Sequence, residues 1–278
     1  MLDLSYQAIV DLALAEDLSA GDVTTEACIP ADVRAVAHAV ARSPLVACGG
    51  AVFARVFERI DPKIAFEAHV ADGAKVEWGT RLWTVRGHAR SILMGERAAL
   101  NFVQRMCGIA TLTREYVDKL PPGSRTRVID TRKTTPGLRA IERYAVRCGG
   151  GHNHRDNLGS AVLIKDNHIM AAGSISAAIG RAKTYAPHTT KIECEVDTLE
   201  QLDEAIAAGA DIVLLDNMKT PMIQEAVARA KGRVLLEASG GMTPARIAEL
   251  AEAGVDTISV GALTHSAPAA DIGIDFAS

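Results

Sequence analysis

The second half of the chain repeats one short pattern, an apolar strand followed by a loop and a helix. The strand candidates after residue 124 are short and mostly lack polar alternation, which is typical of parallel strands buried on both faces. They are Thr126–Asp130, Ala161–Lys165, Lys191–Val196, Asp211–Asp216, Arg233–Ala238 and Asp256–Val260. Six strand–helix units in series predict a parallel α/β barrel. An open dinucleotide-binding sheet is disfavoured, because no GxGxxG follows the first strand.

Helices between the strands carry start and stop signals. Asp197 predicts a helix start and Gly209 predicts its end. Thr243 before Pro244 predicts another start, and Gly254 ends that helix.

The 278 residues leave room for a smaller domain before the barrel. Its expected helices cover 1–18, 50–60 and 90–107, and its expected strands cover 33–40, 64–70 and 82–85. We therefore expect an N-terminal α+β sandwich-like domain over 1–110. An incomplete, about six-stranded parallel α/β barrel is expected over 111–267.

Composition narrows the class of protein. A hydrophobic content of 48% and a charged content of 23% are ordinary for a globular chain. No apolar run approaches the ~18 residues of a membrane helix, and the first residues lack a signal-peptide pattern. The five cysteines lie at least 20 residues apart, which argues against a disulfide framework or a CxxC motif. These features predict a cytoplasmic protein that does not bind membranes.

A basic segment stands out in this acidic chain. Residues 125–165 hold nine Lys or Arg against three acids, although the whole chain has a net charge of −4. Nucleic acid would need a broad basic face, so the local excess predicts a small, multiply anionic ligand and no nucleic acid.

Polar residues fall at or just past the carboxyl ends of the predicted strands. They are Arg132, Lys133, Lys165, Glu195, Asp216, Ser239, Gly240, Gly241 and Gly261. In α/β barrels this rim holds the active site. Arg132, Lys133, Arg155 and Lys165 suit a substrate with two carboxylates, because arginine pairs bidentately with carboxylate. His154, beside Arg155, can donate to the same ligand.

Glu195 and Asp216 are expected to act together. They can hold Mg²⁺, directly or through water, or stabilise positive charge that develops on a ribose ring. A plain ion-pair role with the basic cluster is compatible with both. Glu193 shares a strand face with Glu195, so the pattern alone does not choose between them.

The glycine-rich segment after the last two strands suits a phosphate. Gly240, Gly241 and Gly261 allow backbone N–H groups to approach closely, and the predicted helix start at Thr243 adds a positive dipole end. Ser239 belongs to the same segment.

Other interpretations of these residues stay open. Lys165 at a barrel strand end could be the nucleophile of a Schiff-base aldolase-type lyase. The chain could also be a non-catalytic phosphate-binding module, although paired acids beside a phosphate are costly without a metal. His152 and His154 could bind a metal, but spacing places no third ligand.

Several motifs together resemble one enzyme family. In order they are DTRKTTPGLR, GGGHNHR, LIKDNH, ECEVD, LLDNM and EASGG. They resemble the quinolinate phosphoribosyltransferases (nicotinate-nucleotide pyrophosphorylases, carboxylating) over nearly the whole chain. The resemblance implies transfer of the phosphoribosyl group of phosphoribosyl diphosphate to quinolinate with loss of CO₂, giving nicotinate mononucleotide and diphosphate for NAD biosynthesis.

The resemblance also implies residue roles. It assigns Glu195 rather than Glu193, places Arg139 near the phosphates, and returns 268–278 to the first domain. Lys133, Lys165, Glu195 and Asp216 are the expected catalytic residues, with Glu195 and Asp216 as Mg²⁺ ligands. The expected substrate-binding residues are Arg97, Thr131, Arg132, Arg139, His154, Arg155, Ser239, Gly240, Gly241, Val260 and Gly261.

Arg97 lies outside every predicted strand end. The resemblance places it in a quinolinate pocket that a second subunit completes. Its helix also carries Leu93, Ala98, Leu100 and Phe102, an apolar face expected to bury against more than one small layer. We therefore expect a homodimer with shared active sites, or a higher oligomer.

Overall fold

The computed structural model describes residues 6–277 and divides into two compact units. The first contains residues 1–114, 134–150 and 263–278, and the second contains 115–133 and 151–262. Compared with the expected division, the structure places 134–150 with the N-terminal part of the chain. The first unit is therefore built from three separate stretches of sequence.

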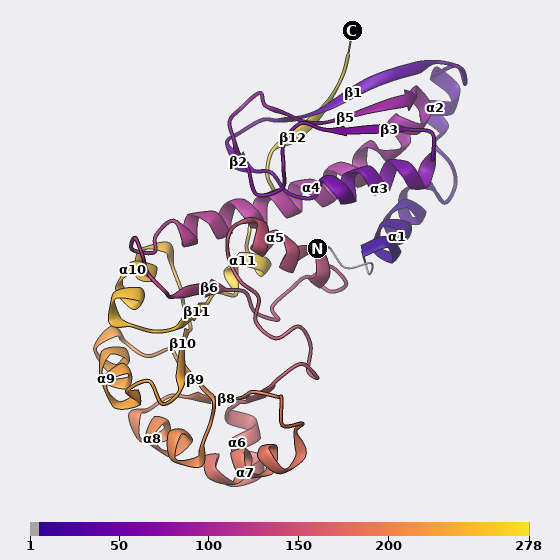
Figure 1. The fold of residues 1–278 in the computed structure, drawn as a ribbon. Helices are drawn as coiled ribbons and strands as arrows, with labels where there is room; N and C mark the ends of the chain where they lie inside the picture. The colour runs from indigo at the N-terminus through magenta and orange to yellow at the C-terminus, as the bar shows by residue number, and fades with distance from the viewer. Residues whose placement is uncertain (1–5, 278) are drawn as a thin grey trace. The chain divides into compact units, whose positions relative to one another are not determined.

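An antiparallel sheet forms one layer of the first unit (Figure 1). Its order is β12–β1–β5–β3, with β1 over Arg34–Ala41, β3 over Ala65–Ala68, β5 over Arg81–His88 and β12 over Ile272–Phe276. Because β12 pairs with β1, the end of the chain joins the first domain's sheet. A two-stranded pair, β2 (Leu45–Val46) and β4 (Lys75–Val76), lies in the same unit.

Helices belong to the same unit, and most of them lie on one side of the sheet (Figure 1). They are α1 (Tyr6–Leu18), α2 (Val23–Cys28), α3 (Gly50–Ile60), α4 (Ala89–Val117) and α5 (Arg139–Cys148). The core holds Phe53, whose ring lies 5.0 Å from that of Phe57 and 5.1 Å from that of Trp83. α4 continues ten residues past the expected 90–107. Of the helix expected over 1–18, residues 1–5 lie outside the described residues.

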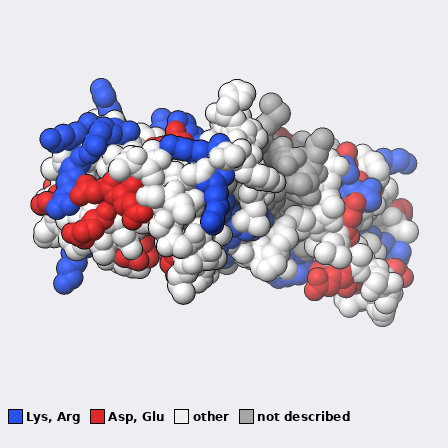
Figure 2. All heavy atoms as spheres, turned by 90° about the horizontal axis from the view of Figure 1, so that it is seen from below, with Lys and Arg blue, Asp and Glu red and all other residues white. Residues whose placement is uncertain are grey.

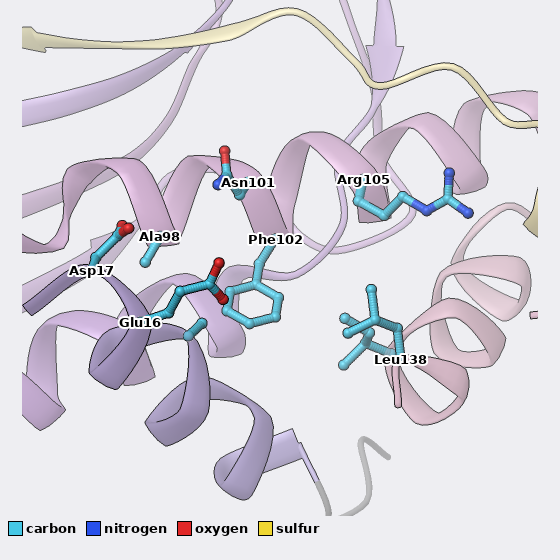
Figure 3. A pocket seen from close by; sticks show the side chains of 9 residues that line it. Glu16, Asp17, Ala98, Asn101, Phe102, Arg105 and Leu138 are labelled. Atoms are coloured by element: carbon cyan, nitrogen blue, oxygen red, sulfur yellow. The ribbon is translucent and has the colours of Figure 1, made fainter. Parts of the chain in front are cut away.

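The inserted helix α5 is fixed to α4 by a partly buried ion pair. Arg105 on α4 donates from Nη2 to Oε1 of the fully buried Glu142 at 2.9 Å. The other Glu142 oxygen accepts from the Thr135 N–H at 3.1 Å. Figure 3 shows Arg105 extending away from Glu16 and Phe102, which line a small pocket of this unit.

Six parallel strands form the sheet of the second unit. They are β6 (Arg127–Ile129), β7 (Val162–Ile164), β8 (Ile192–Val196), β9 (Ile212–Asp216), β10 (Leu235–Ser239) and β11 (Thr257–Ser259). Their order is β6–β11–β10–β9–β8–β7. The last strand thus pairs with the first, as in a barrel, but the first and second do not pair. The sheet is an incomplete α/β barrel, as the sequence predicted.

Helices alternate with these strands and lie outside the curved sheet (Figure 1). They are α6 (Asp166–Ala172), α7 (Ile175–Tyr185), α8 (Leu199–Ala208), α9 (Thr220–Ala230) and α10 (Pro244–Ala253). The short α11 (Ala262–His265) follows β11, and from Leu263 onward its residues belong to the first unit. The N-cap of α8 is Thr198, which accepts from Gln201, so the prediction of Asp197 as the cap was wrong by one residue. Gly209 and Gly254 end α8 and α10 in the left-handed conformation, as predicted.

One face of the molecule carries charges of both signs (Figure 2). On the face drawn in Figure 2, basic and acidic side chains lie next to one another. Within residues 6–277, no helix has the length and apolar character needed to cross a membrane.

Candidate active site

A pocket of about 510 Å³ opens at the carboxyl ends of the barrel strands. Its lining residues are Thr131, Arg132, Lys133, His154, Arg155, Leu163, Lys165, Glu195, Leu214, Asp216, Asn217, Glu237, Ser239, Gly240, Gly241 and Ser259. The volume suits a small-molecule site. Sheet register explains the convergence, because Ser239 pairs with Asp216 and both Glu195 and Glu237 pair with Leu214.

Most of the predicted site residues therefore meet in one pocket, and four do not line it. Val260 is buried behind the sheet end with 1% of its surface exposed. Gly261 follows it at the start of the last connection. Arg139 begins α5 in the first unit, where its Nε donates to Thr134 at 3.1 Å. Arg97 is exposed on α4. The substrate roles of these four residues stay predictions.

Two arginines offer donors to the pocket. The Nε atoms of Arg132 and Arg155 are buried and have no hydrogen-bond partner among the described residues. Arg155 is held in place by a bond from Nη1 to the Ala161 carbonyl at 2.9 Å. Burial lowers the pKa of Arg155, and the nearby charge of Arg132 lowers it further. Two partly buried cations whose buried Nε donors are unsatisfied are costly alone and favour an anionic ligand.

Lys165 and Asp216 have polar partners at the pocket mouth. The Lys165 ammonium forms an ion pair with Glu195, and about half of the lysine side chain is exposed, 47%. Asp216 accepts from the Asn217 side chain at 2.7 Å. A Schiff-base nucleophile must be free to attack a carbonyl carbon, whereas the Lys165 amine is engaged by the Glu195 carboxylate. The geometry therefore favours an electrostatic role for Lys165.

Within the lining of the pocket, His154 contacts two buried carboxylates. Its Nε2 lies 3.2 Å from Oε2 of Glu193 and 3.6 Å from Oε2 of Glu237. Its Nδ1 accepts the Arg155 N–H at 2.6 Å, so the ring proton sits on Nε2 and points toward the acids. The alternative metal pair is not formed with His152, which is exposed. The groups that come together with His154 are instead Glu193 and Glu237.

This cluster shifts the pKa values of its members. Burial and the nearby charge of Glu193 raise the pKa of Glu237 to about 7. Burial alone would lower the pKa of His154, but its hydrogen bond to Glu193 and the charges of both acids outweigh burial and raise it. One Oε1 of each acid lacks a partner among the described residues. The cluster therefore holds protons close to the pocket at neutral pH.

Backbone geometry at Gly240 fits a tight turn beside the pocket. Gly240 has φ 94°, and a Cβ there would lie 2.0 Å from Oδ1 of Asn217. Asn217 itself has φ 53° and donates from its N–H to the Ser239 carbonyl at 3.0 Å. Only glycine fits this position without displacing Asn217. The turn leads to α10, whose N-terminus follows Thr243.

Three polar lining residues were not selected from the sequence: Glu237, Asn217 and Ser259. Glu237 and Asn217 stand inside the EASGG and LLDNM motifs, so their signal was present beside residues that were chosen. Ser259 precedes the selected Val260, and the alternation of strand side chains turns Ser259 rather than Val260 toward the pocket.

The fold and pocket define an α/β barrel protein whose strand ends form a cationic site flanked by carboxylates. Residues 22–107 match the N-terminal domain, and residues 109–275 the C-terminal domain, of the family described as quinolinate phosphoribosyl transferase. The chain therefore belongs to the quinolinate phosphoribosyl transferase family.

Individual relatives match this chain over nearly its full length. The chain is 40% identical over 275 residues to the probable nicotinate-nucleotide pyrophosphorylase (carboxylating) of Bacillus subtilis, covering 99% of this chain and 94% of that protein. It is 45% identical over 269 residues to the nicotinate-nucleotide pyrophosphorylase (carboxylating) of Mycobacterium leprae, covering 95% and 94%. Its structure is similar to NadC from Streptococcus pyogenes, with a TM-score of 0.94, 40% identity and 100% of both chains covered.

Proposed function

We propose that this chain transfers the phosphoribosyl group of phosphoribosyl diphosphate to quinolinate, releasing diphosphate and CO₂ and forming nicotinate mononucleotide. The observation that carries the proposal is the pair of arginines whose buried Nε donors lack partners among residues 6–277. They line one pocket with Lys133 and Lys165, a set of cations that suits a dicarboxylate. Family membership supplies the identity of that dicarboxylate.

The reaction needs little covalent help from the protein. The bond between the anomeric carbon and diphosphate breaks with both electrons leaving on oxygen, and the pyridine nitrogen donates its lone pair to that carbon. The ring then accepts the electrons of the bond to the adjacent carboxylate, CO₂ leaves, and a proton fills the vacated carbon. Arg132, Arg155 and Lys165 would orient quinolinate so that its nitrogen faces the ribose. Glu195 and Asp216 would stabilise positive charge on the ribose.

The two pocket carboxylates also fit a divalent cation. Glu195 and Asp216 end neighbouring strands and line the same pocket, and oxygen ligands of this kind suit Mg²⁺ together with substrate phosphates. We assign Mg²⁺ to them, where it would neutralise charge on the departing diphosphate. Glu195 also forms an ion pair with Lys165, so a cation bound to Glu195 would lie beside the lysine ammonium.

The glycine turn would bind the 5′-phosphate. Ser239, Gly240 and Gly241 line the pocket beside the N-terminus of α10, where backbone N–H groups favour an anion.

Replacing Arg155 by alanine tests the dicarboxylate assignment. Loss of one charge-assisted contact of roughly 1.5–3 kcal/mol should raise the apparent quinolinate constant about 10- to 100-fold. Nicotinate mononucleotide formation, followed with both substrates, measures the change. Arg181→Ala removes the same charge from exposed α7, outside the pocket, and should leave the constant unchanged. Unaltered quinolinate affinity by calorimetry in both Arg132→Ala and Arg155→Ala would contradict the assignment.

We also propose a homodimer in which Arg97 enters the partner's pocket. Arg97 is exposed and is not among the residues lining the pocket of its own chain, which leaves it available to a second subunit. One argument for the dimer fails, because Ala98, Leu100 and Phe102 are already buried within the single chain. The proposal therefore depends on Arg97 and on the family resemblance. A fully active monomer in analytical ultracentrifugation would overturn it.

A cytoplasmic location is proposed from the cysteines. All five are free thiols, as expected in a reducing compartment.

A further inference from the structure

Cysteines that are distant in the sequence meet in the first unit. Cys48 precedes α3, Cys107 lies on α4, and Cys148 is the last residue of α5. Cys107 is hydrogen-bonded to the Cys48 backbone. Its Sγ accepts the Cys48 N–H at 3.2 Å and donates to the Cys48 carbonyl at 3.2 Å. The sulfur atoms of Cys48 and Cys148 lie within 4.8 Å of each other and form a separate pair.

A carboxylate completes this cluster. The two sulfur atoms and one carboxylate oxygen of Asp72 all lie within 4.8 Å of one another. Asp72 is fixed by the Tyr144 hydroxyl, which donates to Oδ2 at 2.8 Å, and by the Gly50 N–H, which donates to Oδ1 at 3.3 Å. Tyr144 belongs to the helix of Cys148, and Gly50 follows Cys48 by two residues. Each cysteine segment thus also positions the carboxylate.

The turn that carries Asp72 packs against both cysteine segments. The Gly73 N–H donates to the carbonyl of Ala47 at 2.7 Å. Gly73 has φ 92°, and a Cβ on it would lie 3.2 Å from the Cys148 carbonyl oxygen. The three ligand-bearing segments are therefore in direct contact, and the arrangement of their side chains is set by close packing.

We propose that Cys48, Asp72 and Cys148 form a binding site for a thiophilic divalent cation of the zinc class. Tetrahedral zinc, with sulfur at about 2.3 Å and oxygen at about 2.0–2.2 Å, spaces its ligand atoms about 3.5–3.8 Å apart. The observed limit of 4.8 Å requires an adjustment of about 1 Å at most. Cys148 and Asp72 are partly exposed, so the fourth position opens to water on their side.

The donor set selects the class of ion. Two sulfur ligands exclude Mg²⁺ and Ca²⁺, which prefer oxygen, and favour zinc-like ions. Burial and the neighbouring Cys148 raise the pKa of Cys48, whereas the hydrogen bond from Cys48 lowers the pKa of Cys148. Binding therefore releases the remaining thiol protons to solvent, and two thiolates and a carboxylate surround a dication. No oxidant or electron transfer is needed.

The site would act on stability rather than on catalysis. It would link the Cys48 segment, the Asp72 turn and α5, and so fasten the inserted stretch 134–150 to the N-terminal part of the first unit. Its residues are distinct from those lining the barrel pocket. The proposal therefore succeeds or fails independently of the transferase reaction.

Cobalt is a suitable spectroscopic probe, because a thiolate ligand gives it a charge-transfer absorption that oxygen and nitrogen ligands do not. Reduced, metal-free protein titrated with Co²⁺ should develop this absorption at one equivalent, and Zn²⁺ should displace it. Cys148→Ser should weaken binding at least tenfold and remove most of the absorption. Asp72→Asn, which keeps both sulfurs, should weaken binding and retain the absorption at saturation.

Cys28→Ser is the matched control, since Cys28 is an exposed thiol on α2. It should titrate like the parent protein. Zn²⁺ should also raise the melting temperature of the parent and of Cys28→Ser more than that of Cys148→Ser. The proposal is overturned if reduced protein shows no thiolate–cobalt absorption. It is equally overturned if Cys148→Ser and the parent titrate alike, or if Cys48 and Cys148 form only a disulfide.

Discussion

Gly108 lies in the middle of α4, where substitution by alanine should favour the helix but disturb its tertiary packing. Alanine at this position would place its Cβ 1.9 Å from the Pro268 carbonyl oxygen and 3.2 Å from the Ala270 nitrogen. An ordinary contact begins at 3.4 Å, so the returning C-terminal segment would have to move by about 1.5 Å. That segment bonds to α4 through the Ala270 N–H, which donates to the Gln104 carbonyl at 2.8 Å.

The magnitude follows from three contributions. Alanine improves helix propensity by about 0.5–1 kcal/mol, overpacking costs about 1–3 kcal/mol, and each strained hydrogen bond costs about 0.5–1.5 kcal/mol. The second bond at risk runs from Nε2 of Gln104 to the Ile272 carbonyl, at 2.8 Å. We expect Gly108→Ala to lower the free energy of unfolding by about 2–3 kcal/mol and the melting temperature by about 4–12 °C.

Gly180 on α7 provides the matched control. A Cβ at Gly180 meets no atom of the described chain within 4 Å, so Gly180→Ala should gain about 0.5–1 kcal/mol and melt about 1–4 °C higher. Thermal unfolding followed by circular dichroism measures both variants. The reasoning is refuted if Gly108→Ala is as stable as the parent, because the C-terminal segment then does not lie against α4 as described.

Three further predictions concern the pocket and the assembly. Asp216→Asn should depress turnover and the response to Mg²⁺ together, while calorimetry still detects quinolinate binding; unchanged Mg²⁺ dependence would contradict the metal assignment. Because burial raises the folded-state pKa of Glu237 from 4.5 to about 7, its stabilising effect is present at acid pH and is lost as pH rises through that window. In Glu237→Gln, the free energy of unfolding measured in urea should therefore fall less between about pH 4.5 and 7, by up to ~3 kcal/mol. Equal slopes of unfolding free energy against pH for variant and parent would refute this. Mixed Arg97→Ala and Lys165→Ala chains should recover activity after subunit exchange, because each mixed dimer has one intact site, and no recovery would exclude a shared site.

Much of the barrel and its site could be predicted because the relevant information is local. A short apolar run followed by a polar residue marks the carboxyl end of a parallel strand, and all such ends meet at one rim. Lys165, Glu195 and Asp216 reach the pocket for this reason. The glycines that end α8 and α10 were predictable in the same way, since a left-handed residue after a helix favours glycine.

Other features depend on contacts between residues that are far apart in the sequence. No local pattern groups Glu237 with Glu193 and His154, because register and burial decide which of two alternating acids turns inward. The burial of the α4 apolar face within one chain also contradicted an expectation drawn from its helical spacing alone.

The sequence by itself determined the alternation of strands and helices in the barrel, the rim on which the cations and acids gather, and the family to which the motifs belong. Tertiary structure decided that 134–150 joins the first unit, that the chain's end pairs with β1, and that Cys48, Asp72 and Cys148 converge. Local sequence patterns reflect the backbone period of a segment and which of its faces meets solvent. Both properties can be inferred from that segment without the rest of the chain. Contacts between segments separated by tens of residues are set only when the whole chain packs, since each such contact depends on the shape of every element between them.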